Sequence, residues 1–67
     1  MWAALAALPP RQRAALVLRF HADLSNGEIA THLGISSANA RLAVHRGLNR
    51  LRKEMHARQE VPAWTTD

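Results

Sequence analysis

The 67-residue chain contains no cysteine, which excludes disulfide bonds and zinc sites built on thiolates. This absence is compatible with a reducing cytoplasm. Long apolar runs are also missing, since none approaches the roughly 18 residues that cross a membrane. The apolar N-terminal segment, MWAALAALPP, lacks the basic start of a secretory signal and leads directly into a proline pair. We therefore expect a cytoplasmic protein without a membrane partner.

Motifs for catalysis and metal binding are missing as well. There is no glycine-rich phosphate loop and no GxSxG-type nucleophile turn, and the five acidic residues are scattered. The four histidines include no His-x-x-x-His pair. His45 and His56 share a helix face, but eleven residues at a rise of 1.5 Å place them about 16 Å apart. The sequence thus predicts no enzyme, no metal or other cofactor, and no small-molecule substrate.

The chain does carry an excess of basic residues. Nine Lys and Arg residues against five Asp and Glu residues give a formal charge of +4 and a sequence pI near 11.5. The stretch from residue 41 to the end is especially basic, with Arg41, Arg46, Arg50, Arg52, Lys53 and Arg58. This distribution favours a polyanionic partner. The length corresponds to one small domain or to a fragment of a larger protein, and such a domain buries only about 60% of its unfolded surface.

Helix signals occur throughout and strand signals are absent. Pro9-Pro10 ends a first apolar helix, and Pro10 suits the first position of the next one. We expect an all-α fold, a small four-helix domain spanning residues 1–58 and containing a helix-turn-helix at 25–55. The expected helices cover residues 2–8, 10–21, 25–33 and 37–58. The segment 59–67 is expected to be a flexible tail.

Three local signals define the helix-turn-helix. Ser25 followed by Glu28 forms a capping box, in which each side chain satisfies an orphan N–H of the other residue. Gly34 stands where a helix ends in the left-handed conformation, with Ile35 directly after it. Either Ser36 or Ser37 then begins the next helix as its N-cap. A natural use of this arrangement is to lay the second helix in the major groove of DNA.

The last helix is expected to have a buried and an exposed face. Stepping about 100° per residue places Ala40, Val44, Gly47, Leu48, Leu51 and Met55 on the core side. The opposite side carries Ala38, Leu42, His45, Arg46, Asn49 and Lys53. The expected set of core and partner-facing residues is Trp2, Leu5, Leu8, Leu16, Phe20, Leu24, Ile29, Leu33, Ile35, Val44 and Leu51.

Several residues of the exposed face are suited to contact DNA bases. The fork of Arg41 or Arg46 matches guanine O6 and N7 or a phosphate group, although exposed arginines also serve solubility alone. His45 lies beside them. Asn39 either pairs with adenine or caps the helix, and Leu42 either touches a thymine methyl group or an apolar protein surface. Ser37, at the start of the helix, belongs to the same expected contact set.

Two further sets are expected to bind phosphate groups and protein partners. Ser25 and Asn26 begin a helix whose N–H groups favour a phosphate, and Arg50 extends the positive field. Trp2 and Leu5 are the first candidates for an apolar partner surface, because the short first helix is not stable alone. Leu42 is the third member of that surface.

At these residues the chain resembles region 4 of a bacterial sigma-70-type transcription initiation factor of the extracytoplasmic-function group. The resemblance covers about residues 8–52 and rests on LPPRQR, an apolar helix ending in Phe20, DLS-x-x-EIA, LGIS and HR-x-x-x-RLR. It implies binding to the upstream (−35) promoter element, docking on the β flap of RNA polymerase core, and sequestration by an anti-sigma factor. It also implies a place with the nucleoid in the cytoplasm.

One departure from the family pattern affects the recognition helix. Arg41 matches a basic position that contacts bases in the family, whereas Leu42 and Ala43 replace polar and basic residues. The preferred promoter sequence therefore does not carry over. Two other functions stay open: a module held mainly by an anti-sigma factor or the flap, and the helix-turn-helix of a response regulator, which shares the EIA and LGIS segments.

Overall fold

The computed structural model describes residues 2–58, with Trp2 described in its backbone only. Within this range there are helices and no strand, which confirms the predicted all-α class. The expected tail, residues 59–67, lies outside the described residues. The elements in chain order are α1 (Trp2–Ala6), α2 (Pro10–Leu16), the π-helical turn η1 (Val17–His21), α3 (Asn26–Leu33) and α4 (Ser37–Ala57).

The first helix ends two residues before the predicted boundary. The N–H groups of Ala7 and Leu8 donate to the carbonyl oxygens of Ala4 and Leu5, both at 3.2 Å, which closes tighter i→i+3 turns. These turns lead the chain into Pro9, which cannot continue a helix by donating an N–H. The early end of α1 thus follows from the proline pair Pro9-Pro10, which separates the first two helices as predicted.

The second predicted helix is continuous, but its last turn is π-helical. The N–H of Ala22 donates to the carbonyl of Val17 at 3.1 Å, a bond that spans five residues. Asp23 then takes a left-handed conformation with φ 58°, which turns the chain toward α3. This widened turn is not predicted by the sequence, which indicates an ordinary helix up to His21.

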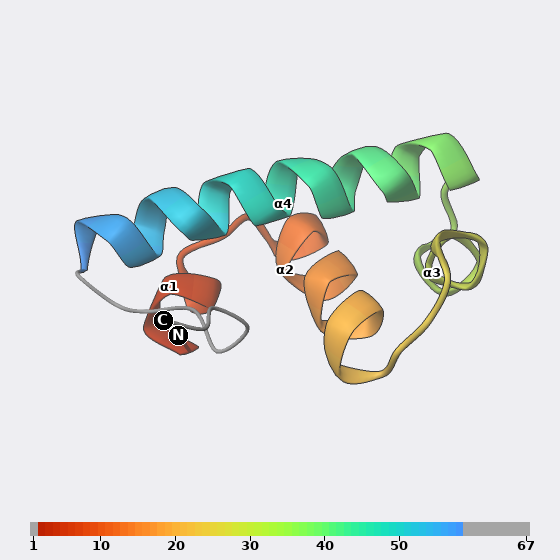
Figure 1. The fold of residues 1–67 in the computed structure, drawn as a ribbon. Helices are drawn as coiled ribbons and strands as arrows, with labels where there is room; N and C mark the ends of the chain where they lie inside the picture. Colours follow the sequence, from red (N-terminus) through yellow and green to blue (C-terminus); the bar gives the residue numbers. More distant parts are fainter. Residues whose placement is uncertain (1, 59–67) are drawn as a thin grey trace.

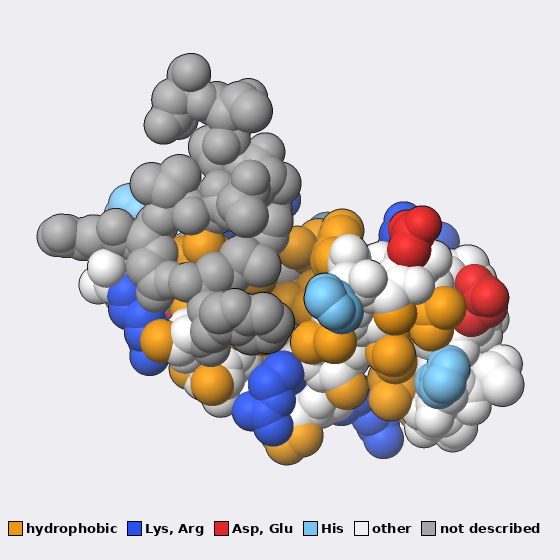
Figure 2. Space-filling model, turned by 90° about the horizontal axis from the view of Figure 1, so that it is seen from below, with side chains coloured by type: hydrophobic (Ala, Val, Ile, Leu, Met, Phe, Trp, Pro, Cys, Tyr) orange, Lys and Arg blue, Asp and Glu red, His pale blue; other side chains and the backbone are white. Residues whose placement is uncertain are grey.

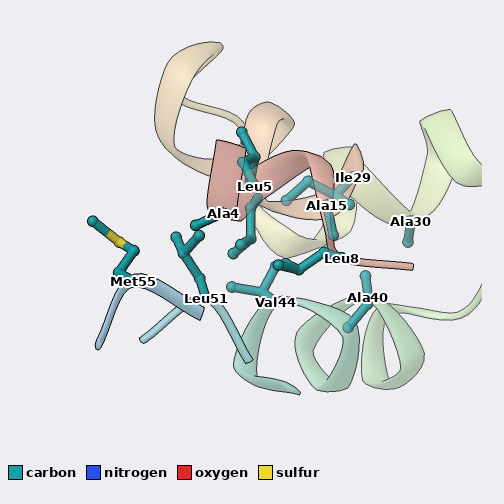
Figure 3. Packing of buried hydrophobic residues seen from close by; sticks show 12 residues of the cluster. Ala4, Leu5, Leu8, Ala15, Ile29, Ala30, Ala40, Val44, Leu51 and Met55 are labelled. Carbon is teal, nitrogen blue, oxygen red and sulfur yellow. The ribbon is translucent and has the colours of Figure 1, made fainter. Parts of the chain in front are cut away.

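Helices α1, α2 and α3 all lie on one side of α4, which runs along the length of the molecule (Figure 1). The 21-residue α4 therefore has one face covered by the other helices and one face open to solvent. The described part of the chain supports this arrangement with a single core, to which every α-helix contributes buried residues (Figure 3).

The core is built from close contacts of small and branched side chains. Of the predicted core residues, Leu5, Leu8, Leu16, Ile29, Val44 and Leu51 are buried, and Leu24, Leu33 and Ile35 are partly buried against them. The core also contains Met55 and five alanines, Ala4, Ala15, Ala30, Ala40 and Ala43. These small residues allow the helix axes to approach one another closely.

Phe20 belongs to the expected set of core and partner-facing residues, and the structure places it at the surface and not in the core. Its side chain is 57% exposed, and the guanidinium carbon of Arg19 lies 5.6 Å from the centre of its ring. The apolar run from Ala14 to Leu18 has no clear period, so the sequence does not define which face of α2 and η1 points inward. The ring instead lies in reach of a cation–π contact at the surface.

Helices α2 and α4 approach each other closely at Gly47. A Cβ atom at this position would lie 3.1 Å from Cγ of Leu16 and 3.3 Å from the carbonyl oxygen of Gln12. The second of these atoms belongs to helix backbone and has little freedom to move. Gly47 is therefore required by the spacing of the two helices, and not by its own backbone angles.

We expect Gly47→Ala to destabilise the fold by about 1 kcal/mol, because overpacking of about 1–3 kcal/mol exceeds the gain in helix propensity. Gly27→Ala is the matched control, since its Cβ would lie 3.9 Å from the Ser25 hydroxyl, an ordinary contact. That variant should be stabilised by up to about 1 kcal/mol. Urea denaturation of both variants measures the two changes; equal stabilisation of both would contradict the close crossing.

Candidate nucleic-acid interface

The start of α3 is fixed by the predicted capping box. The N–H of Ser25 donates to Oε1 of Glu28 at 2.8 Å, and the N–H of Glu28 donates to Oγ of Ser25 at 3.2 Å. Both bonds lower the pKa of Glu28 below its ordinary value, the backbone bond most strongly, because they stabilise its ionised form. The capping box thereby fixes the first turn of α3, which is the first helix of the helix-turn-helix.

The turn between α3 and α4 uses the predicted glycine. Gly34 has φ 67° and ψ 37°, and its N–H donates to the carbonyl of Ala30. The N–H of Ile35 reaches the same carbonyl at 3.0 Å. Helix α4 then begins with Ser36 as its N-cap, since Oγ of Ser36 accepts from the N–H of Asn39 at 3.1 Å. This settles the choice between Ser36 and Ser37.

The outward face of α4 is the one derived from the helical period. All six of its residues are exposed: Ala38, Leu42, His45, Arg46, Asn49 and Lys53. Leu42 is 44% exposed although it is large and apolar. The sequence from residue 37 to residue 53 contains no acidic residue, so the positive charge of this face is not offset by carboxylates of its own helix.

A shallow hollow of about 300 Å³ joins the starts of α3 and α4. It is lined by Asn26, Ser37, Ala38 and Arg41. The fold thus brings together one of the expected phosphate-binding residues and two of the expected base-contacting residues. Oδ1 of Asn26 is buried without a hydrogen-bond donor among residues 2–58, and an oxygen acceptor does not bind phosphate oxygens. A phosphate contact by Asn26 would therefore use its Nδ2 hydrogens.

A second hollow, of about 250 Å³, lies between the start of α2 and the outward face of α4. Its lining comprises Pro9, Arg11, Gln12, Asn39, Leu42, Ala43 and Arg46. The exposed Arg11 was missed by the sequence analysis, because the spacing along the chain does not reveal that the first turn of α2 meets α4 here. Asn39 lies in the same hollow, and the cap of α4 is supplied by Ser36, which leaves the Asn39 side chain available for other contacts.

Arg50 lies further along α4 and is engaged in an ion pair. Its Nε is 3.5 Å from Oε1 of Glu54, and Arg58 binds the other carboxylate oxygen of Glu54. The hydrogen bond from Arg58, followed by the weaker effects of Arg50, lowers the pKa of Glu54 below its ordinary value. The expected phosphate contact of Arg50 stays a prediction, and it would compete with this exposed pair.

The side of the molecule away from α4 carries an apolar surface. Seen from that side, hydrophobic side chains gather with Lys and Arg side chains at their edge (Figure 2). An apolar groove of about 450 Å³ is lined by Leu5, Ala6, Pro10, Arg13, Ala14, Val17 and Leu18. Arg13 donates to the carbonyl of Ala6 at 3.0 Å and so joins α1 to α2 beside the groove.

Leu5 was expected to be exposed, and this part of the prediction is wrong. Only 6% of its surface is accessible, because α1 packs on α4 and buries one of its faces. Leu5 nevertheless lines the groove, so contact with a partner stays a prediction for it. The side chain of Trp2, the other expected partner residue on α1, lies outside the described residues.

Residues 2–58 offer neither a metal site nor a membrane span. No cluster of three or more His, Asp or Glu side chains is placed to hold a metal ion. None of the described helices has the length and hydropathy to cross a membrane.

Comparison with known proteins identifies the family. The sequence model of the family described as "Sigma-70, region 4" matches residues 1–51, which include the helix-turn-helix up to the middle of α4. The chain belongs to the sigma-70 region 4 family. This match favours the sigma-factor resemblance over the response-regulator alternative.

Two curated relatives of this region 4 domain are both named RNA polymerase sigma-E factor. An RNA polymerase sigma-E factor of Streptomyces coelicolor is 43% identical over 54 residues, covering 81% of this chain and 30% of that protein. A sigma-E factor of Streptomyces avermitilis is 41% identical over 54 residues, with the same coverage. The chain thus spans 30% of the length of these relatives. No solved structure matches the chain significantly.

The capping box of this region 4 domain predicts an acid-dependent stability. Because the pKa of Glu28 is lowered on folding, its contribution is complete above its ordinary value of 4.5 and is lost as the pH falls through the folded pKa. Glu28→Gln should therefore melt below the wild type at pH 6, and the difference should narrow as the pH falls below 4.5. Thermal unfolding between pH 3 and pH 6 (roughly the titration range of a carboxyl group) measures this.

Ser25→Ala is the control for that experiment. It removes the hydroxyl acceptor but keeps the Ser25 N–H, which is the main cause of the lowered pKa. Its melting temperature should fall, while much of its pH dependence remains. If the difference in melting temperature between Glu28→Gln and wild type were constant from pH 3 to pH 6 (roughly the titration range of a carboxyl group), the stabilising role of ionised Glu28 in the capping box would be refuted.

Proposed function

We propose that the chain binds promoter DNA in a sequence-specific manner, as the upstream-element reader of a sigma factor that directs RNA polymerase. The observation that carries this proposal is the outward face of α4. It is exposed, basic, free of acidic residues up to Lys53, and held by a capped helix-turn-helix. Helix α4 would lie in the major groove and the start of α3 beside a phosphate group. The role is that of a non-enzymatic factor acting at the nucleoid.

The proposed contacts divide into two kinds. Ser37, Asn39, Arg41, Leu42 and His45 lie in the first three turns of α4, the part of a recognition helix that reaches base edges. Ser25, Asn26 and Arg50 lie where phosphate groups of the duplex would pass. Arg46 and Arg11 border one hollow, so both are placed to add phosphate contacts there. Phosphate contacts supply most of the affinity, and base contacts supply selectivity.

We expect Arg46→Ala to weaken binding to all duplexes by a similar factor and to flatten the dependence of log K on log salt by about one unit. Arg41→Ala should instead relax the preference at one base pair, with a loss of about 1–3 kcal/mol of discrimination. Fluorescence anisotropy with labelled duplexes at two salt concentrations measures both effects. Arg58→Ala serves as control, because Arg58 lies at the far end of α4 in an ion pair with Glu54. Unchanged binding by an Arg41/Arg46 double variant would refute the proposed interface.

The apolar groove favours a second, compatible role in protein binding. It lies between α1 and the α2–η1 helix and shares no lining residue with the two hollows on the proposed DNA face. A protein partner is therefore able to occupy the groove while DNA is bound. We propose that this partner is the β flap of RNA polymerase core, and that an anti-sigma factor would compete for the same surface.

Val17→Asp tests this second role. Val17 lines the groove and is only partly buried, so a carboxylate there should oppose an apolar partner without removing a fully buried side chain. Binding of the chain to purified RNA polymerase core should fall by at least tenfold, with weak salt dependence. Duplex binding should stay within about twofold of the wild type. An equal loss of both activities would indicate general unfolding and would contradict separate surfaces.

A further inference from the structure

The exposed side chain of Leu42 is unusual for its surroundings. Among residues 2–58, the large hydrophobic side chains that are exposed are Phe20 and Leu42. Phe20 lies on η1, which continues α2 and packs against α3, and so is not part of the outward face of α4. Leu42 therefore stands alone as the large apolar group on the outward face of α4.

The position of Leu42 within this face is central. Ala38 lies one turn before it and is also exposed, which adds a methyl group to the same strip. Leu42 lines a hollow with Asn39 and Arg46, so polar and charged groups border it directly. It follows Ser37 by five residues, or about 7.5 Å along the helix axis, within the half of α4 that reaches base edges.

The charge around Leu42 indicates which kind of surface would cover it. Arg41 and Arg46 flank it along the chain, His45 lies one turn further on, and Arg11 of α2 borders the same hollow. An apolar protein surface would have to remove water from these cations without offering them partners. The major groove offers phosphate groups on both walls, together with apolar methyl groups on its floor.

We propose that Leu42 determines specificity by packing against the C5-methyl group of a thymine in the promoter element. This inference rests on the DNA-binding function proposed above. The C5-methyl group is the apolar feature that a base pair displays in the major groove, and 5-methylcytosine carries the same group. Leu42, with Ala38 beside it, selects a methylated pyrimidine at one step, while the neighbouring arginines select hydrogen-bonding groups at adjacent steps.

Thymine-to-uracil replacement tests the proposal, because it deletes one methyl group and leaves every hydrogen-bonding group in place. A duplex selected by the wild-type chain from a random pool is resynthesised with each thymine replaced in turn, and binding is measured by anisotropy. At one or two positions we expect wild-type affinity to fall about fourfold, which corresponds to about 0.8 kcal/mol for one buried methyl group. Leu42→Ala should bind the thymine and uracil duplexes at those positions equally.

Two matched arms separate the methyl contact from other effects. Leu42→Met keeps an apolar side chain of similar volume and should retain the sensitivity to uracil. Replacing a C·G pair at the sensitive step by 5-methylcytosine·G should strengthen binding by the wild type and leave Leu42→Ala unchanged. That result assigns the contact to the methyl group and not to O4 of thymine.

The outcomes that overturn the proposal are distinct from failure of DNA binding. If the wild type binds every uracil duplex as tightly as its thymine counterpart, Leu42 does not read a methyl group, although the domain still binds DNA. If Leu42→Ala keeps the uracil sensitivity, another residue makes the contact. If the wild type binds no duplex even at low salt, the DNA-binding function itself fails, and Leu42 then belongs to a protein interface.

Discussion

The close crossing of α2 over α4 is the contact on which the rest of the molecule depends. At Gly47 there is no side chain between the helices, so Leu16 and the backbone of Gln12 approach α4 directly. This approach brings the first turn of α2 to the outward face of α4, where Arg11 lines one hollow with Leu42 and Arg46. It also sets α2 as one wall of the apolar groove. A wider separation of α2 and α4 would alter both surfaces at once.

Local chemistry in the sequence was sufficient to predict the helix-turn-helix. Ser25 with Glu28, and Gly34 followed by Ile35, act on their own backbone neighbours, and each forms the hydrogen bonds expected for it. The two faces of α4 were predicted equally well, because a helix period assigns every residue of a long amphipathic helix to a side. These signals need no knowledge of how the helices are arranged in space.

Features that depend on distant contacts were not predictable in the same way. The continuous apolar run before Phe20 has no helical period. The sequence therefore could not predict the exposure of Phe20 or the π-helical turn η1. Leu5 looked available to a partner because α1 is short, but packing of α1 on α4 buries it. Arg11 entered the site only through the crossing at Gly47. In each case the missing information was which helix faces which.

The apolar groove and the proposed DNA face are built from different residues, which bears on how so small a domain would act. A single recognition helix with a formal chain charge of +4 has few phosphate contacts to make, and its affinity for DNA alone should be low. A partner held in the groove would tether the domain near DNA and raise its effective concentration there. If a partner holds the domain near DNA in this way, strong general attraction to phosphate is unnecessary. The main role of α4 would then be to distinguish one base sequence from another. An exposed leucine among arginines would provide such selectivity under the proposed contact, since an apolar contact with a base edge would add discrimination without adding affinity for every sequence.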